Sequence, residues 1–61
     1  MAHDRRFQGL TDQADICLNI RHDRGHLSDQ QKEHLIEIRD TLFRDYGAAA
    51  LEWINDINEA L

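Results

Sequence analysis

The chain has no proline, a single cysteine and only three glycines among its 61 residues. Cys17 therefore cannot form an intrachain disulfide, and a lone thiol is most common as a buried apolar side chain in a reducing compartment. Three scattered glycines cannot build the glycine-rich loop of a P-loop or dinucleotide-binding protein. Without proline, no residue of the chain is incompatible with a helix interior. These absences favour helices and exclude several common classes of binding site.

Long apolar runs and alternating apolar patterns are missing as well. No segment is long enough to cross a membrane, and nothing after Met1 resembles the apolar region of a signal peptide. We therefore expect a cytoplasmic protein, and the initiator-like Met1 suggests a complete small open reading frame. No stretch alternates apolar and polar residues over the length of a strand. The sequence predicts an all-α fold, with residues 1–61 forming one small domain.

Basic residues are few and unevenly placed. Seven arginines and lysines stand against twelve aspartates and glutamates, which gives a net charge of −5 at pH 7. The four arginines of residues 1–26 balance four aspartates, so the whole acidic excess lies in residues 27–61. Phosphate backbones repel such a chain, and this disfavours non-specific binding of nucleic acid.

The clearest helix boundary in the sequence lies around Gly25. Glycine adopts the left-handed conformation that ends many helices. Ser28 followed three residues later by Gln31 is the pattern of a capping box at a helix start. We predict a first helix that ends before Gly25 and a second that begins at Ser28. Asp4 or Thr11 could cap the first helix, and we favour a start near Asp4.

One apolar stripe dominates the second half of the chain. Its members follow one another at spacings of three or four and lie within about 50° of a common direction on a helix. A second apolar line lies about 80–100° farther round, so the combined face is wide enough to contact two partners. The stripe consists of Leu35, Ile38, Leu42, Tyr46, Ala49, Trp53, Ile57 and Ala60. The second line consists of Ile36, Phe43, Ala50, Ile54 and Leu61.

Gly47 interrupts the stripe without changing its phase. The alanines at 48–50 are strong helix formers that lack a capping side chain. We therefore favour a helical hairpin whose long second helix is continuous or gently bent over residues 28–60. The alternative is a break at Gly47 and a three-helix arrangement. A helix over residues 28–60 would span about 50 Å against about 31 Å for residues 4–24, which would leave its last turns uncovered.

These uncovered turns are the candidate functional site. Bare apolar stripes of this width mark association surfaces, and a twofold homodimer is the simplest way to cover one. We therefore expect a homodimer. Aromatic residues spaced like Tyr46 and Trp53 on an apolar stripe are most often core residues, and the alternative is that Trp53 anchors the interface, where tryptophan is enriched. The expected interface residues are Leu42, Tyr46, Ala49, Ala50, Trp53, Ile54, Ile57 and Leu61.

Catalytic and metal-binding patterns are weak. His22 and His26 have a spacing that can bind zinc on one helix, but Gly25 lies between them and ends the helix. Two pairs of carboxylates have ordinary exposed helix spacing and no apolar pocket that would suit them to acid–base catalysis. These pairs are Asp12 with Asp15 and Glu33 with Glu37. We expect no catalytic residue, no bound metal and no cofactor.

The sequence thus favours a non-enzymatic protein-interaction module that modulates or inhibits a partner protein, for instance one encoded by a phage or another mobile element. An acidic helical protein can also imitate nucleic acid and block an enzyme that binds it. The alternative is a small helix-turn-helix regulator that binds DNA, with Gly25 in the turn. Its recognition helix would present Asp29, Gln30 and Glu33 to DNA, and two of these are acidic. Nucleic acid is therefore the less favoured partner.

Overall fold

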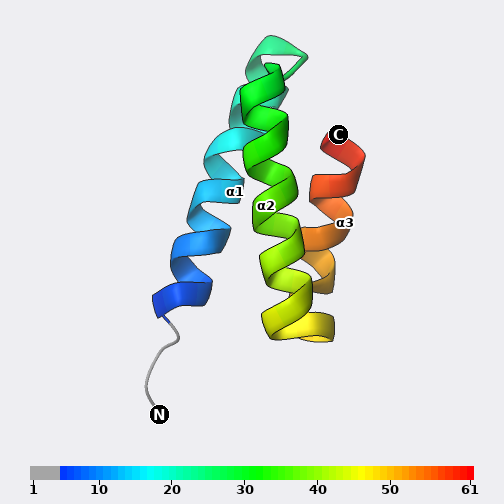
Figure 1. Cartoon of the computed structure of the whole chain (residues 1–61). Helices are drawn as coiled ribbons and strands as arrows, with labels where there is room; N and C mark the ends of the chain where they lie inside the picture. Colours follow the sequence, from blue (N-terminus) through cyan, green and yellow to red (C-terminus); the bar gives the residue numbers. More distant parts are fainter. Residues whose placement is uncertain (1–4) are drawn as a thin grey trace.

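The computed structural model of the chain describes residues 5–61 as a small helical bundle (Figure 1). Helix α1 spans Arg5–Arg24 and α2 spans Asp29–Tyr46. A short 3-10 helix, η1, covers Gly47–Ala50 and leads into α3, which spans Leu51–Ala60. Residues 5–61 contain no strand, so the predicted all-α fold is confirmed. None of the helices in this range combines the length and apolar character needed to cross a bilayer.

The turn between α1 and α2 has the predicted chemistry. Gly25 has a φ of +81°, and its backbone N–H donates to the carbonyl of Arg21 at 2.7 Å. The Ser28 hydroxyl oxygen accepts from the backbone N–H of Gln31 at 3.2 Å. The backbone N–H of Ser28 donates to Gln31 Oε1 at 3.0 Å, which completes the capping box. These bonds fix the start of α2 and make α1 and α2 a helical hairpin.

The start of α1 is settled only in part by the structure. Thr11 lies inside α1, where its hydroxyl donates to the carbonyl of Gln8 at 3.1 Å, so it does not cap the helix. Asp4, the favoured cap, lies outside the described residues.

The preferred prediction of one helix over residues 28–60 is wrong at Gly47. Gly47 has φ +55° and ψ −125°, a combination that residues with a side chain rarely adopt. Its backbone N–H donates to the carbonyls of Leu42 and Phe43, which closes α2. After η1 the chain reverses, and α3 runs back alongside α2 (Figure 1). The three-helix alternative describes the structure.

Burial explains why the chain turns back. Ala50 and Ile57 are completely buried, and Ile54 is buried as well. On a straight helix of about 50 Å these side chains would extend past the end of α1 into water. Burial of one such isoleucine contributes about 1.5–3 kcal/mol, which exceeds the local cost of a turn at glycine. An apolar side is present on both sides of Gly47 because α3, like α2, directs one side to the core.

The core lies between the three helices. The largest fully buried side chains are Leu35, Leu42 and Ile57. Helix α1 contributes Ala14 and Cys17 to the same cluster. Burial raises the pKa of the Cys17 thiol above its ordinary value, because the thiolate would lose its hydration. The cysteine thus serves as a small apolar core residue.

The end of the hairpin opposite Gly25 is held by two contacts between α1 and α2. Arg6 Nη2 lies 2.6 Å from Asp45 Oδ2. The rings of Phe7 and Tyr46 meet edge to face, with centroids 4.8 Å apart and planes inclined at 69°. These contacts hold the first turns of α1 against the last turn of α2.

Candidate functional site

The eight predicted interface residues do not form one exposed surface. Four of them are buried inside the chain: Leu42, Ala50, Ile54 and Ile57. Two are half-buried, Tyr46 and Trp53, and two are exposed, Ala49 and Leu61. The expectation that the last turns lack cover is wrong, because α3 folds against both other helices. Whether any of these residues contacts a partner stays a prediction.

The exposed apolar surface lies elsewhere. Residues 5–61 leave five large apolar side chains exposed to solvent. They are Ile16 on α1, Ile36 and Phe43 on α2, Leu51 on α3 and Leu61 directly after α3. Phe43 is the most exposed of the five, at 69 %.

A hydrogen bond between α2 and α3 shows which edges of the two helices face each other. Arg39 Nη1 donates to Asn58 Oδ1 at 2.9 Å. Ile36 and Phe43 are three residues before and four residues after Arg39, so they lie on the same edge of α2. Both side chains therefore stand beside α3, at the outer side of the contact.

Asn58 marks the matching edge of α3. Leu51 lies two turns before Asn58 and Leu61 three residues after it, so both lie near that edge. Because α2 and α3 are antiparallel, Phe43 and Leu51 lie toward η1, while Ile36 and Leu61 lie toward the other end (Figure 1). We call this surface the α2/α3 face; it consists of Ile36, Phe43, Leu51 and Leu61 around the Arg39–Asn58 hydrogen bond. It contains four of the five exposed large apolar side chains.

Acidic residues border the α2/α3 face on both sides. Each step along a helix turns the side chain by about 100°, so residues 38–40 run from the core across the facing edge to the outside. Residues 57–59 do the same on α3. Asp40 and Glu59 therefore lie beyond the apolar edge of their helices. The α2 rim consists of Glu33 and Asp40, and the α3 rim consists of Glu52 and Glu59; all four are exposed.

Two cations share the face with these four carboxylates. The Arg39 guanidinium lies 3.3 Å from Asp40 Oδ1 and also binds Asn58, and its side chain is 31 % exposed. Lys32 lies on the same edge of α2, four residues before Ile36, and is half-buried. The charge around the apolar side chains is therefore negative, and Arg39 is already paired within the chain.

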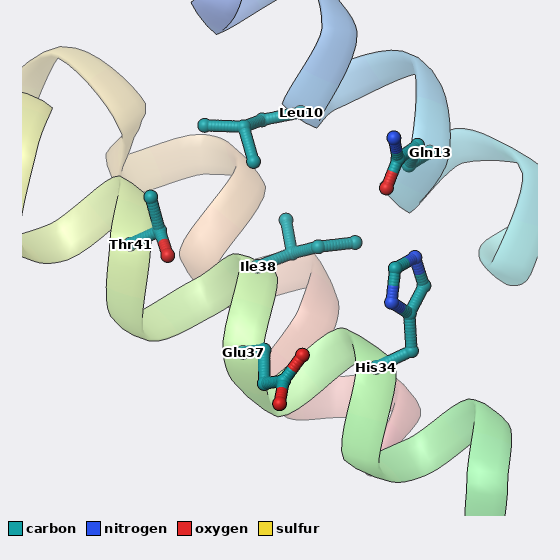
Figure 2. Close-up of a pocket in the computed structure, with 6 residues that line it drawn as sticks. All are labelled: Leu10, Gln13, His34, Glu37, Ile38 and Thr41. Atoms are coloured by element: carbon teal, nitrogen blue, oxygen red, sulfur yellow. The ribbon is translucent and has the colours of Figure 1, made fainter.

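A second concave feature lies between α1 and α2 (Figure 2). It has a volume of about 200 Å³, below the range of about 300–1,000 Å³ typical of small-molecule sites. Figure 2 shows the His34 ring reaching from α2 toward Gln13 of α1, with the Ile38 side chain between the helices. The lining residues are Leu10, Gln13, His34, Glu37, Ile38 and Thr41. The size and shallow form of this groove make it a poor candidate for a catalytic site.

The histidine pair considered for zinc is not part of a metal site that the structure brings together. His22 lies in the last turn of α1 and His26 in the following turn, and both are exposed. Within residues 5–61 no group of three His, Cys, Asp or Glu side chains is placed to hold a metal ion.

The residues of the α2/α3 face were only partly visible in the sequence. Ile36, Phe43 and Leu61 belong to the second apolar line, but of these the predicted interface included Leu61 alone. Leu51 belongs to neither line. The useful signal was the α2 part of the second line, Ile36 and Phe43, since a helix that buries its first stripe leaves the adjacent line at the edge.

Comparison of the chain with models of protein families, with curated proteins and with solved structures finds no match. The function is therefore inferred from the geometry and charge of the α2/α3 face.

Proposed function

We propose that this protein is a non-enzymatic protein-interaction module of the cytoplasm, which binds a partner protein through the α2/α3 face and thereby modulates or inhibits that partner. One observation carries the proposal. Four of the five large apolar side chains that residues 5–61 expose lie together on this face. Single exposed apolar residues are ordinary on protein surfaces, whereas a group bordered by polar residues is typical of an association site.

The fold buries these four side chains only in part, and Ile36 and Leu61 still leave 37 % and 38 % of their surface exposed. Phe43 leaves 69 % of its surface in water and Leu51 leaves 52 %. The core beneath them is filled by other residues, among them the fully buried Leu42 and Ile57. An interaction is therefore the better explanation for the large apolar groups at the edge.

Two other expectations have less support. The homodimer stays a prediction, but its original argument, an uncovered end of a long helix, no longer applies because α3 folds back. For the DNA-binding alternative, a helix-turn-helix joins its helices at about 90–120°, whereas α1 and α2 lie side by side as an antiparallel hairpin (Figure 1). No observation on the structure favours DNA.

Site-specific photo-crosslinking tests the proposed function. A benzophenone amino acid replaces Phe43 in one variant and Ile16 in a matched control, since Ile16 is also exposed but lies on α1. After irradiation in extract of the native host, we expect a discrete adduct from position 43 that position 16 does not give. Mass spectrometry then identifies the partner. Identical adducts from both positions, or none from position 43, would count against the α2/α3 face.

A further inference from the structure

We infer that the segment bound by the α2/α3 face is a basic amphipathic helix of the partner protein, lying along α2 and α3. The inference rests on the proposed function and names the chemistry of the partner at the same face. It is carried by the spacing of the apolar side chains and by the acidic rims on both sides.

The apolar spacing suits a helix. Ile36 and Phe43 are seven residues apart on one edge of α2, which is about 10.5 Å along the helix axis. Leu51 and Leu61 give α3 a comparable pair at the same two ends of the face. An amphipathic helix presents apolar anchors at i, i+3 or i+4, and i+7, so its stripe can contact both ends of the face.

The rims specify the charge of that helix. Glu33 and Asp40 border the face along α2, and Glu52 and Glu59 border it along α3. Lysine and arginine have long apolar stems and can reach outward from a buried stripe to carboxylates on either side. The one cation at the centre, Arg39, is held by Asp40 and Asn58 and so opposes a basic ligand less than a free arginine would.

The same rims argue against a second copy of the chain on this face. In a twofold dimer the same surface meets itself. Because both rims are acidic, either orientation of the axis would place carboxylates of one copy near carboxylates of the other, which is unfavourable. Nucleic acid is excluded on similar grounds, because its phosphates would approach four exposed carboxylates.

A designed peptide tests the inference on the full chain. The probe is a fluorescein-labelled helix of about 18 residues, or five turns, made of one leucine stripe flanked by lysines. Fluorescence anisotropy measures its binding, and a second peptide has glutamate in place of every lysine. We expect saturable binding of the lysine peptide and none of the glutamate peptide at the same concentrations.

Matched variants distinguish binding at the α2/α3 face from non-specific binding to exposed apolar side chains. Phe43→Ser should weaken binding of the lysine peptide by about tenfold or more, as for an anchor residue. Ile16→Ser, which removes another mostly exposed apolar side chain, from α1, should leave the affinity within about twofold. Circular dichroism confirms that both variants keep their helices. Equal losses in the two variants would overturn the inference.

Neutralised carboxylates test the rims in the same way. The double variant Glu52→Gln, Glu59→Gln removes two charges from the α3 rim. Its control, Asp15→Asn with Asp23→Asn, removes two exposed charges from α1 and gives the same net charge. We expect the rim variant to weaken binding of the lysine peptide several-fold and to reduce the salt dependence of that binding. The control should change neither the affinity nor its salt dependence.

Other results would overturn the inference. They are equal binding of the glutamate peptide, equal effects of the rim variant and its control, or a dimer in sedimentation that Phe43→Ser dissociates. The last result would assign the face to a second copy. Crosslinking from position 43 in host extract tests the proposed function separately, so a failure of the basic-helix inference is distinguishable from a failure of the face.

Discussion

Helix α2 packs against α1 on one side and against α3 on the other, and the side chains at the edges of these two contacts differ. Toward α1, the contact ends in the Arg6–Asp45 ion pair and the Phe7–Tyr46 ring contact. Toward α3, one side-chain hydrogen bond, Arg39 to Asn58, crosses between the helices. Beside that hydrogen bond, the side chains of Ile36 and Phe43 are exposed to solvent. One helix thus has a side whose edge is closed by an ion pair and a ring contact, and a side that leaves apolar surface exposed.

The difference separates stability from binding. The buried stripe, with Leu35, Leu42 and Ile57 fully enclosed, stabilises the bundle. The exposed edge with Phe43 adds little to stability and is available to a partner. Substitutions in the two groups should therefore have opposite signatures in unfolding and binding experiments, and the predictions below run from the largest effect to the smallest.

Ile57→Ala should have the largest effect on folding. The side chain is completely buried, and removal of an isoleucine from such a site costs about 2–5 kcal/mol. A chain of this size is marginally stable, so the variant can be largely unfolded. Ile57→Val, with an expected loss of about 0.5–1.5 kcal/mol, keeps the test quantitative. Urea unfolding followed by circular dichroism measures both. An unchanged midpoint for both variants would contradict the docked position of α3.

Gly47→Ala should destabilise the chain by about 1–3 kcal/mol, because a side chain at φ +55° and ψ −125° is strained. The strain comes from the backbone, since an added Cβ would meet nothing within 4 Å. Gly9→Ala is the matched control. Gly9 lies inside α1 with the same free space, so alanine should stabilise there by about 0.4–1 kcal/mol. Thermal unfolding that ranks the two variants the other way would argue for a continuous helix through residue 47.

Cys17 should make the chain less stable at alkaline pH. Burial raises its thiol pKa, so above the ordinary thiol pKa of about 8.5 the unfolded chain loses a proton that the folded chain retains. The free energy of unfolding contributed by this group is complete below that pH and decreases as the pH rises. Cys17→Ala should lack this part of the pH dependence. Parallel slopes for the two proteins in urea unfolding between about pH 7 and 10 would refute it.

Phe43→Ser should have the smallest effect on folding. The side chain is mostly exposed, and substitutions at such positions change stability by about 0.5 kcal/mol or less. Chemical unfolding of this variant and of Ile16→Ser should give midpoints close to that of the parent chain. A large loss for Phe43→Ser would mean that its ring belongs to the core rather than to a binding face.

The sequence was sufficient for features that depend on neighbouring residues. Ser28 and Gln31 lie three residues apart and form the capping box whatever the rest of the chain does. Gly25 has the positive φ expected of a helix end. Both features need only local geometry, so the hairpin of α1 and α2 was predictable.

The reversal at Gly47 was not predictable in the same way. The apolar phase on either side of Gly47 is compatible with a straight helix and with a return, and burial of Ile54 and Ile57 against distant residues decides between them. The position of the exposed apolar surface depends on this reversal of the chain at Gly47. The sequence favoured Trp53 as a core residue and left an interface anchor as the alternative; in the folded chain it packs half-buried against the core. Phe43 lies on the edge of α2 beside α3, and 69 % of its surface stays exposed.

The division between the buried stripe and the α2/α3 face is tested most directly by two measurements on the same pair of variants. Urea unfolding and anisotropy with the lysine–leucine peptide are recorded for Ile57→Val and Phe43→Ser. The structure predicts a lower unfolding midpoint with parental affinity for Ile57→Val, measured where it is folded, and a parental midpoint with weakened binding for Phe43→Ser. If Phe43→Ser lowers the midpoint and leaves the affinity unchanged, the assignment of the two surfaces is wrong.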